Sequence, residues 1–205
     1  MGQRLKKDRC SHCRMLPEVC FCDEIPRIDI ATRVILVAHK KEIRKPTNTG
    51  RLAMLTLNDC ELHVRGHRDQ PVDLSAVPVP GRRTWLLFPS KDAVVLSRRL
   101  VESDARPITL LVPDGNWGQA RRAVRREPVL VAASTVTVPA NRPSRYRLRR
   151  EVFPGGLATF EAIARALGII EGEHVQLAME KVFDTMVERV LKGRGNRRPI
   201  PPLPK

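Results

Sequence analysis

The chain has 205 residues, 42% of them hydrophobic and only 4% aromatic, which is enough for one domain of ordinary size with a mainly aliphatic core. Its 37 Lys and Arg against 22 Asp and Glu give a net charge of +15, which favours a phosphate-rich partner; a generally arginine-rich proteome is the alternative. No apolar run approaches the roughly 18 residues of a membrane span, and the charged start has no apolar stretch behind it. We therefore expect a soluble, cytoplasmic protein.

Four of the five cysteines lie close together near the start, in a C-x2-C, six-residue gap, C-x-C array: Cys10, Cys13, Cys20 and Cys22. A cytoplasmic setting keeps thiols reduced, so metal ligation explains the array better than disulfides, and four thiolates close a tetrahedral structural zinc site. Because the C-x-C half is tighter than usual, His12 as a ligand, a redox pair and unligated thiols stay open. Such a closed zinc site would hold structure or RNA. Cys60 stands apart and is expected to be a small buried residue.

Strands and helices alternate in the first half of the chain. The apolar run over residues 32–38, which ends at His39, is typical of a buried parallel strand. A basic irregular loop follows, and Asn48-Thr49-Gly50 then leads into a helix over residues 51–57. A short strand is expected over residues 61–65.

A proline-rich surface loop over residues 66–83 leads to a second strong strand, over residues 84–88. Pro89 and Ser90 close this strand. Ser90 is expected to cap a helix over residues 93–101.

The next unit is a strand-to-helix turn. A β-branched and leucine run over residues 109–113 stops, and a helical pattern begins around Trp117, so Asp114 lies at the turn between them. α/β proteins place their chemistry at such turns. Gly115 lets the chain turn or a ligand approach closely, and Asn116 is a good N-cap.

Two basic segments follow this turn. In the predicted helix, Arg121 and Arg125, and likewise Arg122 and Arg126, are like charges at i, i+4, which suggests that something anionic compensates them. Residues 141–150 form a basic loop with the lone tyrosine, Tyr146, and are either an RNA-binding surface or a solvated charged loop. The expected RNA-binding residues are Arg121, Arg122, Arg125, Arg145, Arg147 and Arg149.

The C-terminal part contains a β-rich run over residues 129–138, a helix over residues 159–167 and a core-packing helix over residues 173–191. A flexible basic tail is expected from residue 193 to 205. The alternation of strands and helices predicts an α/β domain with a mostly parallel sheet flanked by helices. The sequence has no G-x-G-x-x-G and no G-x-x-x-x-G-K-[ST], so neither a dinucleotide fingerprint nor a P-loop is supported.

Four blocks are specific in order and spacing: His39-x-x-Glu42 with Asn48-Thr49-Gly50-Arg51-Leu52; Leu87-Phe88-Pro89-Ser90; Asp114-Gly115-Asn116-Trp117 with Gln119-Ala120-Arg121; and Thr159-Phe160-Glu161-Ala162. With the cysteine array ahead of them, they resemble the DTW-domain family over about residues 10–191. The resemblance implies a SPOUT-like α/β fold in which a knotted C-terminal region binds the cofactor. It also implies a tRNA-uridine aminocarboxypropyltransferase, which moves the 3-amino-3-carboxypropyl group of S-adenosylmethionine (SAM) to N3 of a uridine in tRNA and leaves methylthioadenosine.

This chain departs from the family pattern at two positions. Asn116 stands where the family usually has Thr; Asn still caps a helix or hydrogen-bonds a ligand, but a role of the Thr hydroxyl does not carry over. Ala158 stands where the family usually has Ser, and the lost hydroxyl weakens the case for the Thr159 block as a ligand contact.

Asp114 is the candidate catalytic base, because uridine N3 carries a proton and is a poor nucleophile; a cap of the following turn is the alternative. Trp117 either stacks on adenine or uracil or simply packs. Asn48 and Thr49, at a helix start, are expected to reach the cofactor's carboxylate, and His39 and Glu42 to support their loop. The expected cofactor-binding residues are Asn48, Thr49, Pro89, Ser90, Val112, Pro113, Gly115, Asn116, Trp117 and Thr159.

The expected organisation is a zinc-binding segment over residues 1–30, a catalytic domain over residues 31–192 and the basic tail over residues 193–205. Two other functions stay open. One is a SPOUT-like RNA methyltransferase, and the other is a zinc-ribbon protein that binds RNA without catalysis. The oligomeric state is not indicated by the sequence.

Overall fold

The computed structural model describes residues 9–148 and 156–194. Its centre is a six-stranded sheet in the order β2-β1-β5-β3-β6-β4, in which every neighbouring pair is parallel. The strands are β1 (Arg33–His39), β2 (Cys60–Arg65), β3 (Arg83–Leu87), β4 (Val94–Val95), β5 (Ile108–Asp114) and β6 (Ser134–Thr137). The helices are α1 (Thr49–Thr56), α2 (Arg98–Glu102), α3 (Trp117–Arg126), α4 (Pro128–Ala132), α5 (Thr159–Ile170) and α6 (Glu173–Gly193), with 3-10 turns η1 (Pro17–Val19) and η2 (Cys22–Glu24). The predicted α/β class with a parallel sheet is confirmed.

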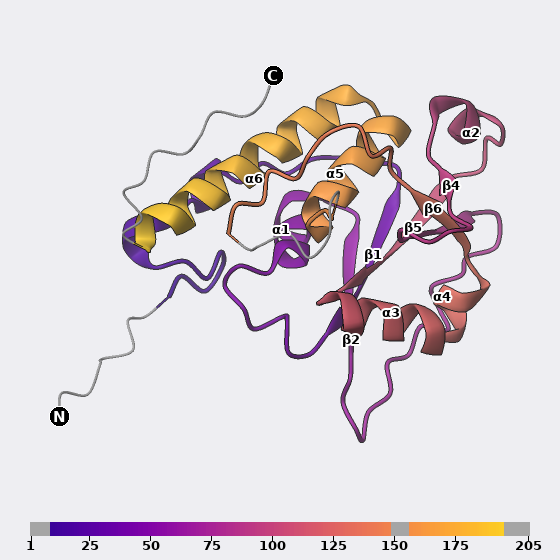
Figure 1. The fold of residues 1–205 in the computed structure, drawn as a ribbon, viewed down its shortest axis with the longest axis horizontal. Helices are drawn as coiled ribbons and strands as arrows, with labels where there is room; N and C mark the ends of the chain where they lie inside the picture. The colour runs from indigo at the N-terminus through magenta and orange to yellow at the C-terminus, as the bar shows by residue number, and fades with distance from the viewer. Residues whose placement is uncertain (1–8, 149–155, 195–205) are drawn as a thin grey trace.

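Helices cover both faces of the sheet (Figure 1). Along β1, Val34 and Leu36 pack in the core that includes residues of α1, α5 and α6, whereas Ile35 and Val37 pack with residues of α3 and α4 on the other face. Because both faces are buried, the central strands are apolar at nearly every position, which is why their sequence runs are continuous rather than alternating. The carboxyl ends of the parallel strands all lie at one edge of the sheet.

The helix expected over residues 93–101 is wrong, and so is its cap at Ser90. The β-branched pair Val94 and Val95 forms strand β4, which pairs with Val136 and Thr137 of β6. The helix that follows, α2, begins later, and Ser97 caps it by accepting a hydrogen bond from the Leu100 amide. Sheet pairing at the edge has overridden a weak helical pattern.

The β-rich run expected over residues 129–138 is correct only in its second half. Pro128 starts the short helix α4, which ends at Ala132 before β6 begins at Ser134. Proline is favoured at the first helical position, because its fixed φ suits the helix and its missing N–H has no intrahelical partner there.

The N-terminal segment packs against the rest of the domain. Met15 and Val19 belong to the same core cluster as the helices, and Arg189 of α6 forms an ion pair with Glu24. Helix α6 continues to Gly193, the first residue of the expected tail, and residues 195–205 of that tail lie outside the described part. Within the described residues, no helix is both long and apolar enough to span a membrane.

Candidate active site and cysteine cluster

A cleft of about 310 Å³ opens at the carboxyl ends of β1, β5 and β3, a volume in the range of small-molecule sites. Nine of the ten residues predicted to bind the cofactor line it: Asn48, Thr49, Pro89, Val112, Pro113, Gly115, Asn116, Trp117 and Thr159. Ser90 is the exception, since it is exposed and does not line the cleft. The structure therefore brings these nine residues together at one edge of the sheet.

Asp114, the last residue of β5, joins three elements at the floor of the cleft. Asp114 is 5% exposed, and its carboxylate accepts a hydrogen bond from Asn48 Nδ2 at 2.7 Å and another from Thr159 Oγ1 at 2.6 Å. Asn48 precedes α1, and Thr159 is the first residue of α5. One side chain thus fixes the starts of two helices against the end of the central strand.

A glycine leaves the space beside this carboxylate open. A Cβ built on Gly50 would lie 2.8 Å from both Cγ and Oδ2 of Asp114, which is closer than real Cβ contacts. Gly50 stands in the first turn of α1, where its φ is ordinary, so close approach rather than turn geometry explains the glycine.

Three helix N-termini converge on the cleft, those of α1, α3 and α5, and each carries a partial positive charge. Asn48 caps α1 by accepting from the Arg51 amide at 2.6 Å. Asn116 caps α3 in a full capping box, in which its side chain accepts from the Gln119 amide and Gln119 Oε1 accepts from the Asn116 amide. Such an arrangement suits a ligand with a negatively charged group.

His39 supports the capping box from the neighbouring strand end. Gln119 Oε1 already accepts a hydrogen bond, so its Nε2 donates, and it lies 3.3 Å from His39 Nδ1. Burial, followed by the charges of Arg65 and Lys41, lowers the pKa of His39 and favours the neutral ring that can accept this bond. The expected role of His39 as a structural partner thus extends to the start of α3 rather than only to its own loop.

The outer wall of the cleft belongs to the basic loop that was predicted to be either an RNA-binding surface or a solvated charged loop. Ser144 and Tyr146 line the cleft; the hydroxyl of Ser144 donates to Glu161 of α5, and that of Tyr146 donates to the Thr47 carbonyl of the β1–α1 loop. Glu161, 3% exposed, accepts hydrogen bonds from Ser144 Oγ at 2.7 Å, from the Arg145 amide at 2.5 Å and from the Ala158 amide at 2.9 Å. No local pattern marks this loop as a cleft wall, because its position depends on partners 16 or 17 residues away.

The apolar side of the cleft includes Trp117, whose ring lies 6.0 Å from that of Phe88 at an interplanar angle of 57°. Leu87, Pro89 and Val112 continue this surface. Phe88 was not predicted as a site residue, although it stands inside the Leu87-Phe88-Pro89-Ser90 block at the end of β3, and it lines the cleft.

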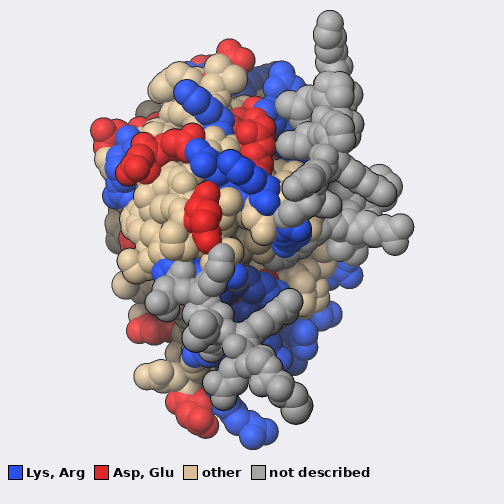
Figure 2. Space-filling view, turned by 90° about the vertical axis from the view of Figure 1, so that its left-hand side faces the viewer, with Lys and Arg blue, Asp and Glu red and all other residues tan. Residues whose placement is uncertain are grey.

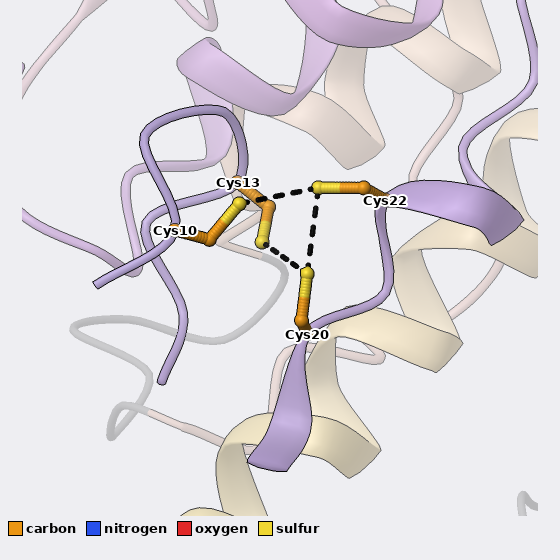
Figure 3. Close-up of side chains that lie close together, drawn as sticks. All are labelled: Cys10, Cys13, Cys20 and Cys22. Atoms are coloured by element: carbon orange, nitrogen blue, oxygen red, sulfur yellow. Dashed lines mark hydrogen bonds between the residues drawn. The ribbon is translucent and has the colours of Figure 1, made fainter. Parts of the chain in front are cut away.

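The four N-terminal cysteines point toward one another from two turns of the chain (Figure 3). Their sulfur atoms all lie within 4.8 Å of one another, and three of the distances are 3.5, 3.5 and 3.6 Å. A tetrahedral zinc with four sulfurs at about 2.3 Å separates the sulfurs by about 3.8 Å. The four predicted ligands therefore have the spacing that a tetrahedral zinc site needs.

Without a metal, the groups around the cluster favour a thiolate at Cys10 alone, whereas burial raises the pKa of Cys13 and Cys22. Hydrogen bonds from the Cys13 and His12 backbone lower the pKa of the Cys10 thiol to about 6. The Arg51 guanidinium, on α1, donates to the carbonyls of Ser11 at 3.3 Å and His12 at 2.6 Å. Arg51 thereby ties the loop between the first two cysteines to the helix whose start lines the cleft.

Cys60 lies apart from this cluster and is half-buried, close to the expected small buried residue. Its burial raises the thiol pKa to about 12, so the thiol stays protonated and unreactive at neutral pH.

The comparisons with known proteins agree with this geometry. The model of the DTW domain matches residues 7–191. The chain belongs to the DTW domain family. It is 28% identical over 174 residues to tRNA-uridine aminocarboxypropyltransferase 2 of Drosophila melanogaster, with 81% of this chain and 68% of that protein covered. It is also 28% identical over 231 residues to tRNA-uridine aminocarboxypropyltransferase A of Arabidopsis thaliana, with 98% and 87% covered.

Among solved structures, the fold of this DTW protein is similar to that of the SAM-dependent rRNA:acp-transferase Tsr3 from Vulcanisaeta distributa. The TM-score is 0.51 and the sequence identity 14%, over 83% of this chain and 80% of the other. At this identity the similarity concerns the fold alone, and it agrees with the fold that the family resemblance implied.

The two departures from the usual DTW pattern have different structural consequences. Asn116 performs the N-cap role completely, with a side-chain acceptor on the Gln119 amide. Ala158 has no side-chain acceptor, so α5 keeps only the half of the cap that Glu161 provides. Thr159 nevertheless lines the cleft of this DTW protein and binds Asp114.

The arginines expected to bind RNA fall into three groups. Arg121, Arg122 and Arg125 are exposed on α3, beside the cleft. Arg145 is instead committed to Asp184 and Glu180 of α6, which neutralise its charge, so it holds the loop rather than offering a cation to RNA. Arg147 is half-buried, and its Nε has no hydrogen-bond partner among the described residues; Arg149 lies outside them.

Proposed function

We propose that this DTW protein transfers the 3-amino-3-carboxypropyl group of SAM to N3 of a uridine in tRNA. The observation that carries the proposal is the cleft at the carboxyl edge of the parallel sheet, centred on a buried Asp114 that two helix starts hold in place. The relatives from Drosophila melanogaster and Arabidopsis thaliana, whose sequences align with most of this chain, are named tRNA-uridine aminocarboxypropyltransferases. The RNA partner agrees with the net charge of +15.

The residues of the cleft fit the parts of SAM. Phe88, Pro89 and Trp117 offer an apolar surface for the adenine ring. The helix starts at Thr49 and Thr159 offer backbone N–H groups for the carboxylate. The Asn48 side chain already donates to Asp114 through Nδ2 and accepts from the Arg51 amide through Oδ1. Of Asn48 and Thr49, Thr49 is therefore the better-placed contact for the SAM carboxylate.

The reaction forms a bond between uridine N3 and the terminal carbon of the aminocarboxypropyl group, and breaks the bond from that carbon to sulfur. The sulfur keeps the electron pair and leaves in neutral methylthioadenosine, while the N3 proton passes to a base. Asp114 is the residue we propose as that base, because it is an acid fixed at the floor of the cleft. Its hydrogen bonds from Asn48 and Thr159 hold the carboxylate in one orientation, which favours a defined angle of approach.

The decisive experiment is mass spectrometry of tRNA nucleosides after incubation with the protein and SAM. Aminocarboxypropyluridine and an equal amount of methylthioadenosine are expected. A methylated nucleoside with S-adenosylhomocysteine would instead identify a methyltransferase, and absence of heat on titration with SAM would identify an RNA-binding protein without catalysis.

The Asp114→Asn variant tests the base. It keeps the side-chain size but removes the charge, so we expect SAM to bind while turnover falls by about 100-fold or more, the scale of general-base catalysis. Full turnover with tRNA would show that Asp114 only joins the three elements.

We also propose that the exposed arginines of α3 bind tRNA phosphates: Arg121, Arg122 and Arg125. This role would relieve the like-charge repulsion along the helix. Affinity for tRNA should fall steeply as salt rises, because each neutralised phosphate releases counterions. An affinity that is flat between low and physiological salt would contradict the proposal.

We propose that the cysteines bind one structural zinc, in a segment over residues 1–30 attached to the catalytic domain over residues 31–192. Bound zinc would stabilise the cysteine turns, and Arg51 would offset part of the negative charge of four thiolates. Metal analysis should find one zinc per chain, and chelation should lower the melting temperature. A Cys60→Ser variant should keep its zinc, whereas a Cys13→Ser variant should lose most of it.

A further inference from the structure

A second cavity, of about 260 Å³, lies where the N-terminal segment, the β1–α1 loop and the end of α6 meet. These parts lie together on the left-hand side of Figure 1. Figure 2 shows that side of the molecule, where basic side chains gather in the middle and lower part of the face beside the residues drawn in grey. Neither Asp114 nor the residues proposed to hold SAM line this cavity.

The cavity has an apolar interior and a cationic border. Its apolar residues are Met15, Leu16, Val19, Pro46 and Val190, and its basic residues are Arg9, Lys45 and Arg194. Lys45 shares its charge with the buried Glu42, 2.6 Å away. Within the described part of the chain, Arg9 and Arg194 form no ion pair: their guanidinium groups donate to the backbone carbonyls of Arg14 and Leu148.

One segment separates this cavity from the transfer cleft. Lys45, Pro46 and Thr47 line the second cavity, and the next two residues, Asn48 and Thr49, line the cleft. The Tyr146 hydroxyl, from the wall of the cleft, donates to the Thr47 carbonyl at 3.0 Å and holds the segment in place. A polymer with a repeating charge is the kind of ligand that can occupy two neighbouring cavities at once.

We propose that the second cavity binds a nucleotide of the tRNA that presents its uridine to the cleft. Arg9 and Arg194 contact phosphates, and the base with its ribose lies on the aliphatic interior. The cavity has about the size of a base with its ribose, is too small for a helix of a partner protein, and has the charge that a phosphate backbone requires. The inference rests on the proposed function, since it concerns the same RNA.

The test compares tRNA binding by Arg9→Glu and Arg194→Glu with binding by a control, Arg99→Glu. Arg99 is exposed on α2, on the opposite side of the molecule in Figure 1, and its variant carries the same change in net charge. Fluorescence anisotropy across a salt series should show several-fold weaker binding for the first two variants than for the control. Their slope of log K against log salt should also be smaller by about 0.7 to 0.9 for each lost phosphate contact.

Photo-crosslinking provides a second measurement that does not depend on charge reversal. tRNA carrying 4-thiouridine should crosslink the wild-type protein within residues 15–19, 45–47 or 190–194. Crosslinks confined to the cleft and α3, together with equal tRNA affinities of the three variants, would overturn the proposal.

Failure of the inference differs from failure of the proposed function. If no methylthioadenosine forms and SAM does not bind, the proposed function is wrong, while the comparison of tRNA affinities still decides whether the second cavity binds RNA. If transfer occurs but both variants bind tRNA as the control does, only the second cavity has been misassigned.

Discussion

Gly50 is the residue whose substitution tests the geometry of Asp114 most directly. In Gly50→Ala the new methyl group would meet the Asp114 carboxyl at 2.8 Å and displace it. Because a shift of about 1 Å at a reacting group costs about 100-fold in rate, we expect turnover to fall by that order while the helix-favouring alanine preserves the fold. Steady-state kinetics and thermal unfolding measure the two effects.

Gly118→Ala is the matched control. Gly118 also lies in the first turn of a helix that lines the cleft, but a Cβ there would meet its nearest atom, Asn116 Oδ1, at 3.5 Å. This variant should keep its activity and change stability by no more than about 1 kcal/mol. Equal losses of activity in both variants would show that alanine acts through the helices rather than through Asp114.

Glu161 is a positioning residue for the outer wall of the cleft. Glu161→Gln keeps one acceptor oxygen but replaces the other with a donor that faces the Ser144 hydroxyl or the Arg145 amide. We expect a loss of about 1.5–3 kcal/mol in stability, the range for hydrogen bonds to a charged group, and a higher KM for SAM with a smaller change in kcat. Ser144→Ala, which removes only one donor, should show a weaker effect in the same direction.

We expect His39 to make the stability of the protein depend on pH. Its pKa is lowered mainly by burial, then by Arg65, Lys41 and Arg122, with Glu42 acting in the opposite direction. The unfolded chain, whose His pKa is about 6.5, binds the proton first as pH falls. The stabilisation is therefore complete above about pH 6.5 and is lost as pH falls through the lowered pKa.

Denaturant unfolding between pH 7.5 and 5 should show this loss in the wild-type protein and a smaller one in His39→Gln. The exposed His67→Gln serves as the control and should keep the wild-type pH dependence. A His39→Gln curve parallel to that of the wild type would contradict the assignment.

At the scale of elements, the starts of α3 and α5 offer a paired prediction. Ala158 has the extended backbone of an N-cap but no side-chain acceptor, and Glu161 already accepts from its amide. Ala158→Ser should complete the capping box and stabilise the protein by about 0.5–2 kcal/mol, whereas Asn116→Ala should destabilise it by a similar amount. For a protein of this size, 1 kcal/mol corresponds to about 2–4 °C in melting temperature.

The elements that the sequence predicted well are those with a strong local signal. β1 and β5 are continuous apolar runs, and α6 has apolar residues at helical spacing over most of its length. The edge of the sheet was predicted poorly. Val94 and Val95 of β4 are both exposed, so the sequence shows no alternation of buried and exposed residues that would indicate a strand. Only their pairing with β6 makes them a strand. Short edge elements depend on neighbours that are distant in sequence.

At the scale of the whole molecule, the candidate site also has one part that local sequence predicts and one part that depends on residues distant in sequence. Asp114 is the last residue of β5, and Asn116 and Trp117 follow it closely, so their place at the carboxyl edge was predictable from the sequence. The wall formed by Ser144 and Tyr146 was not, because Glu161, Arg165 and the acids of α6 place it. The basic residues of this loop therefore suggested an RNA-binding surface, whereas Arg145 attaches the loop to α6 through its ion pairs with Glu180 and Asp184.

The hydrogen bonds of Asp114 also bear on how the protein folds. They join residues separated by 66 and 45 positions in sequence, so the cleft forms only after long loops have closed. The cleft should then be absent from partly folded forms, and ligand binding should stabilise the native state as a whole. Saturating SAM is accordingly expected to slow hydrogen exchange not only in α1, β5 and α5, which line the cleft, but also in β2, which does not.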